Sequence, residues 1–149
     1  TPLAGSLKSM QDEQLAEILN GITTIAVVGY SANPQRPSHR VARYLQERGY
    51  DVYPVNPRLL GQEHLGRPVH ADLASIPVAI DMVDVFRRPE HLLGVVAEAL
   101  AVNAGLVWTQ LDVVNEEAQQ LAVDNGLPTI VDRCPAIEIP RLVASGLMQ

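Results

Sequence analysis

The stretch that decides the fold is residues 24–38, TIAVVGYSANPQRPS. It opens with a short apolar run at 25–28 that ends at Gly29, and such a run is typical of a strand buried on both faces of a parallel sheet. A loop rich in Asn, Pro and Arg follows, and Ser38 is expected to cap a helix that runs to about Arg48. A strand, a glycine-started loop and a helix N-terminus together favour phosphate binding, because free N–H groups and the helix dipole point into the loop.

The composition limits what the chain can be. Its 149 residues, 47% of them hydrophobic, suffice for one well-filled core. No apolar run is long enough to cross a bilayer, and the first residues lack the basic-then-apolar plan of a secretion signal. Cys134 is the single cysteine, which excludes an internal disulfide and favours a reducing, cytoplasmic location. The formal net charge of -6 argues against a nucleic-acid partner, while a homo-oligomer stays open.

Strand and helix patterns alternate along the whole chain. Residues 1–9 show no periodicity and are expected to pack loosely. Helices are predicted at 11–20, 38–48, 89–103, 115–126 and 137–144, with one helical turn at 72–75, and strands at 25–28, 51–55, 67–70, 79–86, 106–108 and 129–131. This alternation predicts a single Rossmann-like α/β domain over residues 1–149, with a doubly wound, mainly parallel sheet of five to six strands and helices on both faces.

In such sheets a ligand lies outside the carboxyl ends of the strands, where the strand order reverses. The residues expected there are Gly29, Tyr30, Ser31 and the loop 33–36, then Asn56, Pro57 and Arg58, then Phe86, Arg87 and Arg88, then Thr109 and Gln110, and finally Asp132, Arg133 and Cys134. Hydroxyls, backbone amides and arginines in one place suit a nucleotide that carries several phosphates. His64 and His70 have no partner at metal-ligand spacing, so no metal site is expected.

Two features argue against a dinucleotide such as NAD. The glycine pattern G-x-G-x-x-G is missing after Gly29. The acidic residue that would bind the ribose at the end of the second strand is also missing, and Val55, Asn56 and Pro57 stand there instead. An Asn can hydrogen-bond a base or a ribose, and the flanking Val and Pro offer an apolar surface to an adenine.

Four collinear stretches carry a family resemblance: IAVVGYSANPQRPSHRVARYLQERGYDVYPVNP, DMVDVFRRPE, VWTQLDVVNEEA and DRCPAIEIPRL. With them the chain resembles the small stand-alone CoA-binding proteins over nearly all of residues 15–142. These are single Rossmann-type domains similar to the CoA-binding domain of the succinyl-CoA synthetase α-subunit. The resemblance implies that the chain binds CoA or acyl-CoA. The synthetase depends on a phosphorylated histidine in a second domain, so the resemblance implies binding without ligase chemistry and without a catalytic residue.

The resemblance also implies a role for each part of the site. Gly29, Tyr30 and Ser31 would wrap the phosphate end of CoA, helped by Arg36 and Ser38. Val55, Asn56 and Pro57 would hold the adenosine. Phe86, Arg87 and Arg88 would contact the nucleotide or the pantetheine arm, and Trp108, Thr109 and Gln110 would lie towards the pantetheine end.

Other interpretations stay open at the level of sequence. Phe86 and Trp108 also fit core positions, and Tyr30 could simply cover the loop. A small transferase or other enzyme that uses a CoA or NAD-type nucleotide would have Cys134, Asp132 or His39 as its reactive group, although no Cys-His-Asn set is identifiable. A regulatory or oligomerisation domain whose nucleotide pocket has decayed is the third interpretation.

Overall fold

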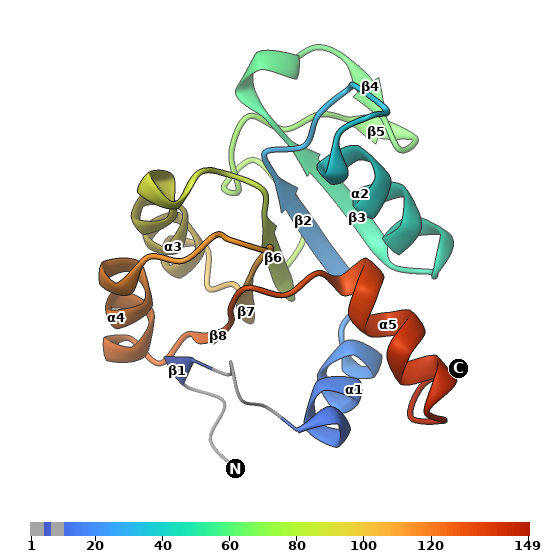
Figure 1. Cartoon of the computed structure of the whole chain (residues 1–149). Helices are drawn as coiled ribbons and strands as arrows, with labels where there is room; N and C mark the ends of the chain where they lie inside the picture. Colours follow the sequence, from blue (N-terminus) through green and yellow to red (C-terminus); the bar gives the residue numbers. More distant parts are fainter. Residues whose placement is uncertain (1–4, 7–10) are drawn as a thin grey trace.

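A computed structural model of the chain describes residues 5–6 and 11–149. Six strands form one parallel sheet in the order β1-β8-β7-β6-β2-β3 (Figure 1). These strands are β1 (Gly5–Ser6), β2 (Thr24–Val28), β3 (Asp51–Val55), β6 (Met82–Val85), β7 (Leu106–Thr109) and β8 (Pro128–Ile130). All five residues of β2 are buried, as expected for a strand covered on both faces.

Helices cover both faces of this sheet. They are α1 (Asp12–Gly21), α2 (Pro37–Glu47), α3 (Leu92–Ala101), α4 (Glu116–Asp124) and α5 (Pro135–Ala144). The buried residues of α1, α2 and α5 share one hydrophobic cluster with one face of the sheet, and those of α3 and α4 share a second cluster with the other face (Figure 1). The predicted doubly wound α/β fold is therefore confirmed.

The strand order reverses between β2 and β6. From β2 the chain crosses to β3 on one side and then returns to β6 on the other, so that Ile25 pairs with both Val52 and Met82. At such a switch point the two outgoing loops diverge and leave a crevice between them. The loops that follow β2 and β6 are those that begin at Gly29 and Phe86.

The segment between β3 and β6 differs from the prediction. A separate antiparallel hairpin of β4 (Glu63–His64) and β5 (Arg67–Pro68) replaces most of the strand expected at 67–70, although His70 forms an isolated parallel bridge with Val55. The helical turn expected at 72–75 is a turn in which Asp72 accepts a hydrogen bond from Ser75 N–H over 2.9 Å. A short polar side chain that bonds to the backbone close by competes with helix formation.

Two further predictions are corrected at element ends. The helix α2 begins at Pro37 and its N-cap is Arg36, so Ser38 lies inside the first turn and does not cap it. Proline suits the first helical position because its fixed φ already matches the helix. The segment 89–103 begins as a 3-10 turn, η2 (Pro89–His91), before α3. By contrast Asn115 caps α4 as its sequence suggests, accepting from Ala118 N–H over 2.9 Å.

The prediction of a loose start at residues 1–9 is wrong at residues 5–6, which form a strand and pair with Pro128 and Thr129 of β8. The other positions of this prediction lie outside the described residues. The pairing could not be read from two small residues without periodicity, since it depends on the edge that β8 offers. In the described part of the chain, no helix combines the length and the hydropathy that a membrane span requires.

Candidate functional site: a cleft at the switch point

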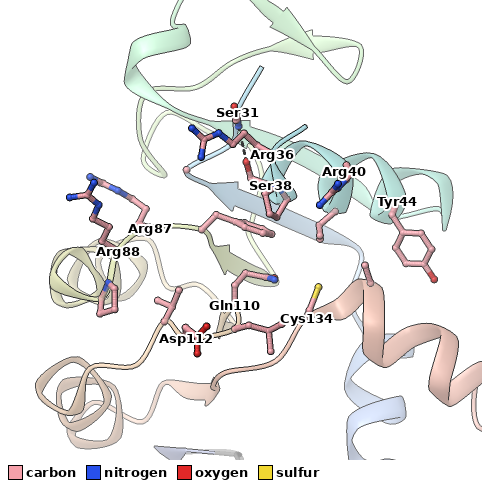
Figure 2. A pocket seen from close by; sticks show the side chains of 18 residues that line it. Ser31, Arg36, Ser38, Arg40, Tyr44, Arg87, Arg88, Gln110, Asp112 and Cys134 are labelled. Atoms are coloured by element: carbon pink, nitrogen blue, oxygen red, sulfur yellow. Dashed lines mark hydrogen bonds between the residues drawn. The ribbon is translucent and has the colours of Figure 1, made fainter. Parts of the chain in front are cut away.

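A cleft of about 1000 Å³ opens at the carboxyl ends of the strands, between the loop after β2, the start of α2 and the segments after β6, β7 and β8 (Figure 2). It brings together many of the predicted site residues. Those that line it are Gly29, Ser31, Arg36, Ser38, Phe86, Arg87, Arg88 and Gln110. Cys134 lines it as well, at the start of α5.

A second cavity of about 520 Å³ adjoins the cleft on the side of β3. Its lining includes Val55, Asn56 and Pro57, the residues expected to hold an adenosine. Gly29, Phe86, Arg87 and Arg88 line both cavities. Phe86 is half-buried and packs against the core while it also lines both cavities, so a core position and a place at the cleft do not exclude each other.

At Gly29 the backbone turns away from β2 into the loop. Its φ of 87° lies in the left-handed region, and its N–H donates to Val55 O over 3.0 Å. A Cβ at this position would lie 2.5 Å from the carbonyl oxygen of Phe86. Only glycine therefore allows the loop after β2 to pass this close to the end of β6.

Most backbone amides of the loop are already paired within the protein. Ser31 N–H donates to Ser38 Oγ over 3.0 Å, Asn33 N–H to Ser31 Oγ over 3.1 Å and Gln35 N–H to Asn33 Oδ1 over 3.0 Å. Arg36 N–H in turn donates to Asn33 O over 3.0 Å. The N–H groups that were expected to be free for a phosphate therefore mostly make hydrogen bonds that fix the shape of the loop. The polar groups that remain to face the cleft are therefore mainly side chains, such as Arg36, Arg87 and Arg88.

Tyr30 and Asn56 hold the loop after β2 in place without lining the cleft. The Tyr30 side chain is buried and lines no part of the cleft; its hydroxyl lies 3.3 Å from His39 Nδ1 and 3.2 Å from His64 Nδ1, and burial raises the pKa of this tyrosine. The Asn56 side chain donates to Tyr30 O over 2.8 Å and accepts from Arg58 N–H over 2.9 Å. Both ends of the Asn56 amide therefore make hydrogen bonds within the protein.

Of the three predicted residues at the end of β7, only Gln110 reaches the cleft. Trp108 is fully buried in the core and donates from Nε1 to Arg133 O over 2.8 Å. Thr109 is buried too, and its hydroxyl accepts from Asp132 N–H over 3.0 Å. These two residues shape the floor of the site without lining it.

Two kinds of residue at the cleft were not predicted from the sequence. Arg40 and Tyr44 line the cleft from α2 (Figure 2), and their spacing of four and eight residues from Arg36 was a signal that they share its side of the helix. Asp84 was missed as well: it is fully buried in the middle of β6 and lies beside the Gln110 amide. A charged residue inside the apolar run AIDMVDVF was its signal.

Burial strongly raises the pKa of the Asp84 carboxyl above its ordinary value. In the orientation that satisfies both ends of its amide, Gln110 donates from Nε2 to Asp84 Oδ1 over 2.7 Å and to Oδ2 over 3.2 Å. The amide carbonyl oxygen of Gln110 therefore lies at the end away from Asp84.

A doubly wound α/β sheet with an arginine-lined cleft at its switch point defines a protein of the Rossmann-like class. The chain belongs to the CoA-binding domain family, whose sequence model matches residues 23–140. The predicted family resemblance is thereby confirmed, and the match includes every predicted cofactor-binding residue.

Three relatives extend over most of the chain. The uncharacterized protein YneT of Bacillus subtilis (strain 168) is 43% identical over 121 residues, which are 81% of this chain and 88% of that protein. A solved structure from Thermus thermophilus is 41% identical with a TM-score of 0.86, covering 89% of this chain and 99% of that one. A hypothetical protein from Pyrococcus horikoshii OT3 is 38% identical with a TM-score of 0.87, covering 93% and 96%.

Proposed function

We propose that the protein binds CoA or acyl-CoA in the cleft and holds it without catalysing a reaction. The observation that carries this proposal is the set of exposed arginines, Arg36, Arg87 and Arg88, around one cleft of a chain from the CoA-binding domain family. A guanidinium offers a planar fork of donors that matches phosphate oxygens. In a protein with a net charge of -6, such a cluster marks a local anion site.

The two cavities suggest how the ligand is arranged. The adenosine lies in the smaller cavity against Val55 and Pro57. The phosphates lie where the cavities meet, beside Arg87 and Arg88, which line both. The pantetheine arm then runs along the larger cleft towards Gln110 and Cys134. This arrangement uses the shared lining of the cavities and follows the order of parts in the ligand.

CoA is expected to bind more tightly than NAD, NADP or ATP, by about tenfold or more if one to two hydrogen bonds distinguish the ligands. The reason is that Gly29 is not followed by the glycine pattern of dinucleotide-binding loops, and that no acidic side chain directly follows β3 to accept from free ribose hydroxyls. Calorimetric titration of the four ligands into the same metal-free protein measures the difference. Equal or tighter binding of NAD would contradict the proposal.

The absence of catalysis is tested at Cys134, the reactive group that an acyl transferase would use. Its side chain lines the cleft and is 8% exposed, and no hydrogen bond to its sulfur is found within the described residues. A nucleophilic cysteine needs a general base within reach. Incubation with acetyl-CoA is therefore expected to leave the intact mass of the protein unchanged. An acyl adduct that turns over on the wild type and is absent from Cys134→Ser would show an enzyme instead.

A further inference from the structure

The floor of the larger cleft presents a buried hydrogen-bond acceptor to a ligand. Gln110 directly follows β7, is 7% exposed, and reaches into the pocket beside the Cys134 thiol (Figure 2). Its Nε2 donates to both carboxyl oxygens of Asp84, which is fully buried. The carbonyl oxygen of Gln110 is therefore the end of the amide that faces the cleft.

The position of this acceptor is fixed by the sheet. Asp84 lies in β6 and pairs in register with Val27 of β2 and Trp108 of β7, so three strands hold its carboxyl in place. A carboxyl group keeps acceptor capacity whether it is ionised or neutral, so the contact from Gln110 Nε2 is available in both charge states. An acceptor held in this way needs little ordering when a ligand binds.

The other polar side chains of the cleft serve different ligand groups. Its arginines offer hydrogen-bond donors only, which suit phosphate oxygens and not N–H groups. The buried hydroxyl of Ser38 already accepts from Ser31 N–H over 3.0 Å. Asp112 and Tyr44 also line the cleft, and both are less buried than Gln110. An N–H group that reaches the floor of the cleft therefore meets its acceptor at Gln110.

The arm of CoA beyond its phosphates carries such groups. Pantetheine contains two amides, each with one N–H, and the cleft beside Gln110 is lined by the apolar side chains of Phe86, Leu111 and Val113. An amide that loses its water among apolar side chains costs free energy unless it finds a hydrogen-bond partner. Gln110 offers that partner.

We propose that the carbonyl oxygen of Gln110 accepts a hydrogen bond from an amide N–H of the pantetheine arm. This inference rests on the proposed function, because it needs the arm to run along the larger cleft. It makes Gln110 a specificity-determining residue, which distinguishes a ligand with an amide-bearing arm from a nucleotide that ends at its phosphates. The contact is the same for CoA and acyl-CoA, since both carry the arm.

Gln110→Met tests the proposal with three ligands: CoA, dethio-CoA, in which a hydrogen replaces the thiol, and ADP, which lacks the arm. The affinities for CoA and dethio-CoA are expected to fall about fivefold to tenfold, as the loss of one net hydrogen bond implies, while that for ADP stays unchanged. Gln120→Met, at an exposed glutamine of α4, should alter none of them. An equal loss for all three ligands, or a loss for CoA alone, would overturn the proposal.

Gln110→Met leaves the Asp84 carboxyl without its partner, so the double variant Asp84→Leu, Gln110→Met is measured beside it. Replacing both partners by apolar side chains of similar size is nearly neutral for stability, and the same selective loss is expected. A double variant that binds CoA as tightly as the wild type refutes only the inference. A wild type that binds neither CoA nor dethio-CoA refutes the proposed function with it.

Discussion

Replacement of Gly29 by alanine is expected to destabilise the protein by about 2–4 kcal/mol and to lower its Tm by roughly 5–15 °C. Two costs add up. The φ of 87° requires a backbone conformation that an L-residue adopts at a cost of about 1–2 kcal/mol. The new Cβ would also lie 2.5 Å from Phe86 O and 3.0 Å from Phe86 C, both of them backbone atoms at the end of β6. Relief of this clash must separate the two loops that form the cleft.

Gly49→Ala is the matched control for this prediction. Gly49 also has a positive φ, 101°, but apart from its chain neighbours no heavy atom of the described residues lies within 4 Å of the position of its Cβ. It therefore carries the conformational cost without the clash. Urea and thermal unfolding of both variants measure the difference, and the loss at Gly29 should be about twice that at Gly49 or more. Equal losses would show that the close approach to β6 is not important for stability.

Arg36→Ala and Arg87→Ala are each expected to weaken CoA binding by about 10-fold to 150-fold, the equivalent of 1.5–3 kcal/mol for a hydrogen bond to a charged group. Both side chains line the cleft. The effect should be large because the amides of Ser31, Asn33 and Gln35 already donate within the loop. These amides therefore cannot replace the hydrogen bonds to phosphate that the arginine variants lose. The binding that remains should also depend less on salt, because one phosphate contact is lost.

Arg43→Ala is the control for these variants, because Arg43 is an exposed arginine of the same helix α2 that does not line the cleft. It removes the same charge and should leave the affinity for CoA nearly unchanged. Titrations over a salt series compare the three variants. If Arg36→Ala and Arg87→Ala both bind as Arg43→Ala does, the arginines at the cleft are only solvated.

The alternation of elements and the position of the cleft could be predicted because both depend on local sequence. The apolar run before Gly29 forms a central strand, and parallel strands bring their carboxyl ends to one edge. The loops that start at Gly29 and Phe86 must therefore meet, whatever the details of packing. For the same reason Arg36, Arg87 and Gln110 were found at the cleft, although they are far apart in sequence.

The remaining features depend on contacts that the sequence does not specify locally. Tyr30 could cover the loop or bind a ligand; in the structure its side chain packs in the core and its hydroxyl contacts His39 and His64, which the sequence does not place beside it. The engagement of Asn56 likewise depends on where Tyr30 O lies. The burial of Asp84 requires α2 and α5 to pack over that face of the sheet. Each of these three features depends on which residues, distant in the sequence, pack or hydrogen-bond together in the folded protein.

The internally bonded loop between β2 and α2 also bears on the kinetics of binding. Fixing one flexible residue costs about 1–2 kcal/mol of conformational entropy. A loop whose shape is already held by Ser31, Asn33 and Ser38 spares an incoming ligand most of that cost. Association then needs no slow rearrangement of this segment, and ligands of similar charge should arrive at similar rates. Their affinities would differ through how long each one stays bound.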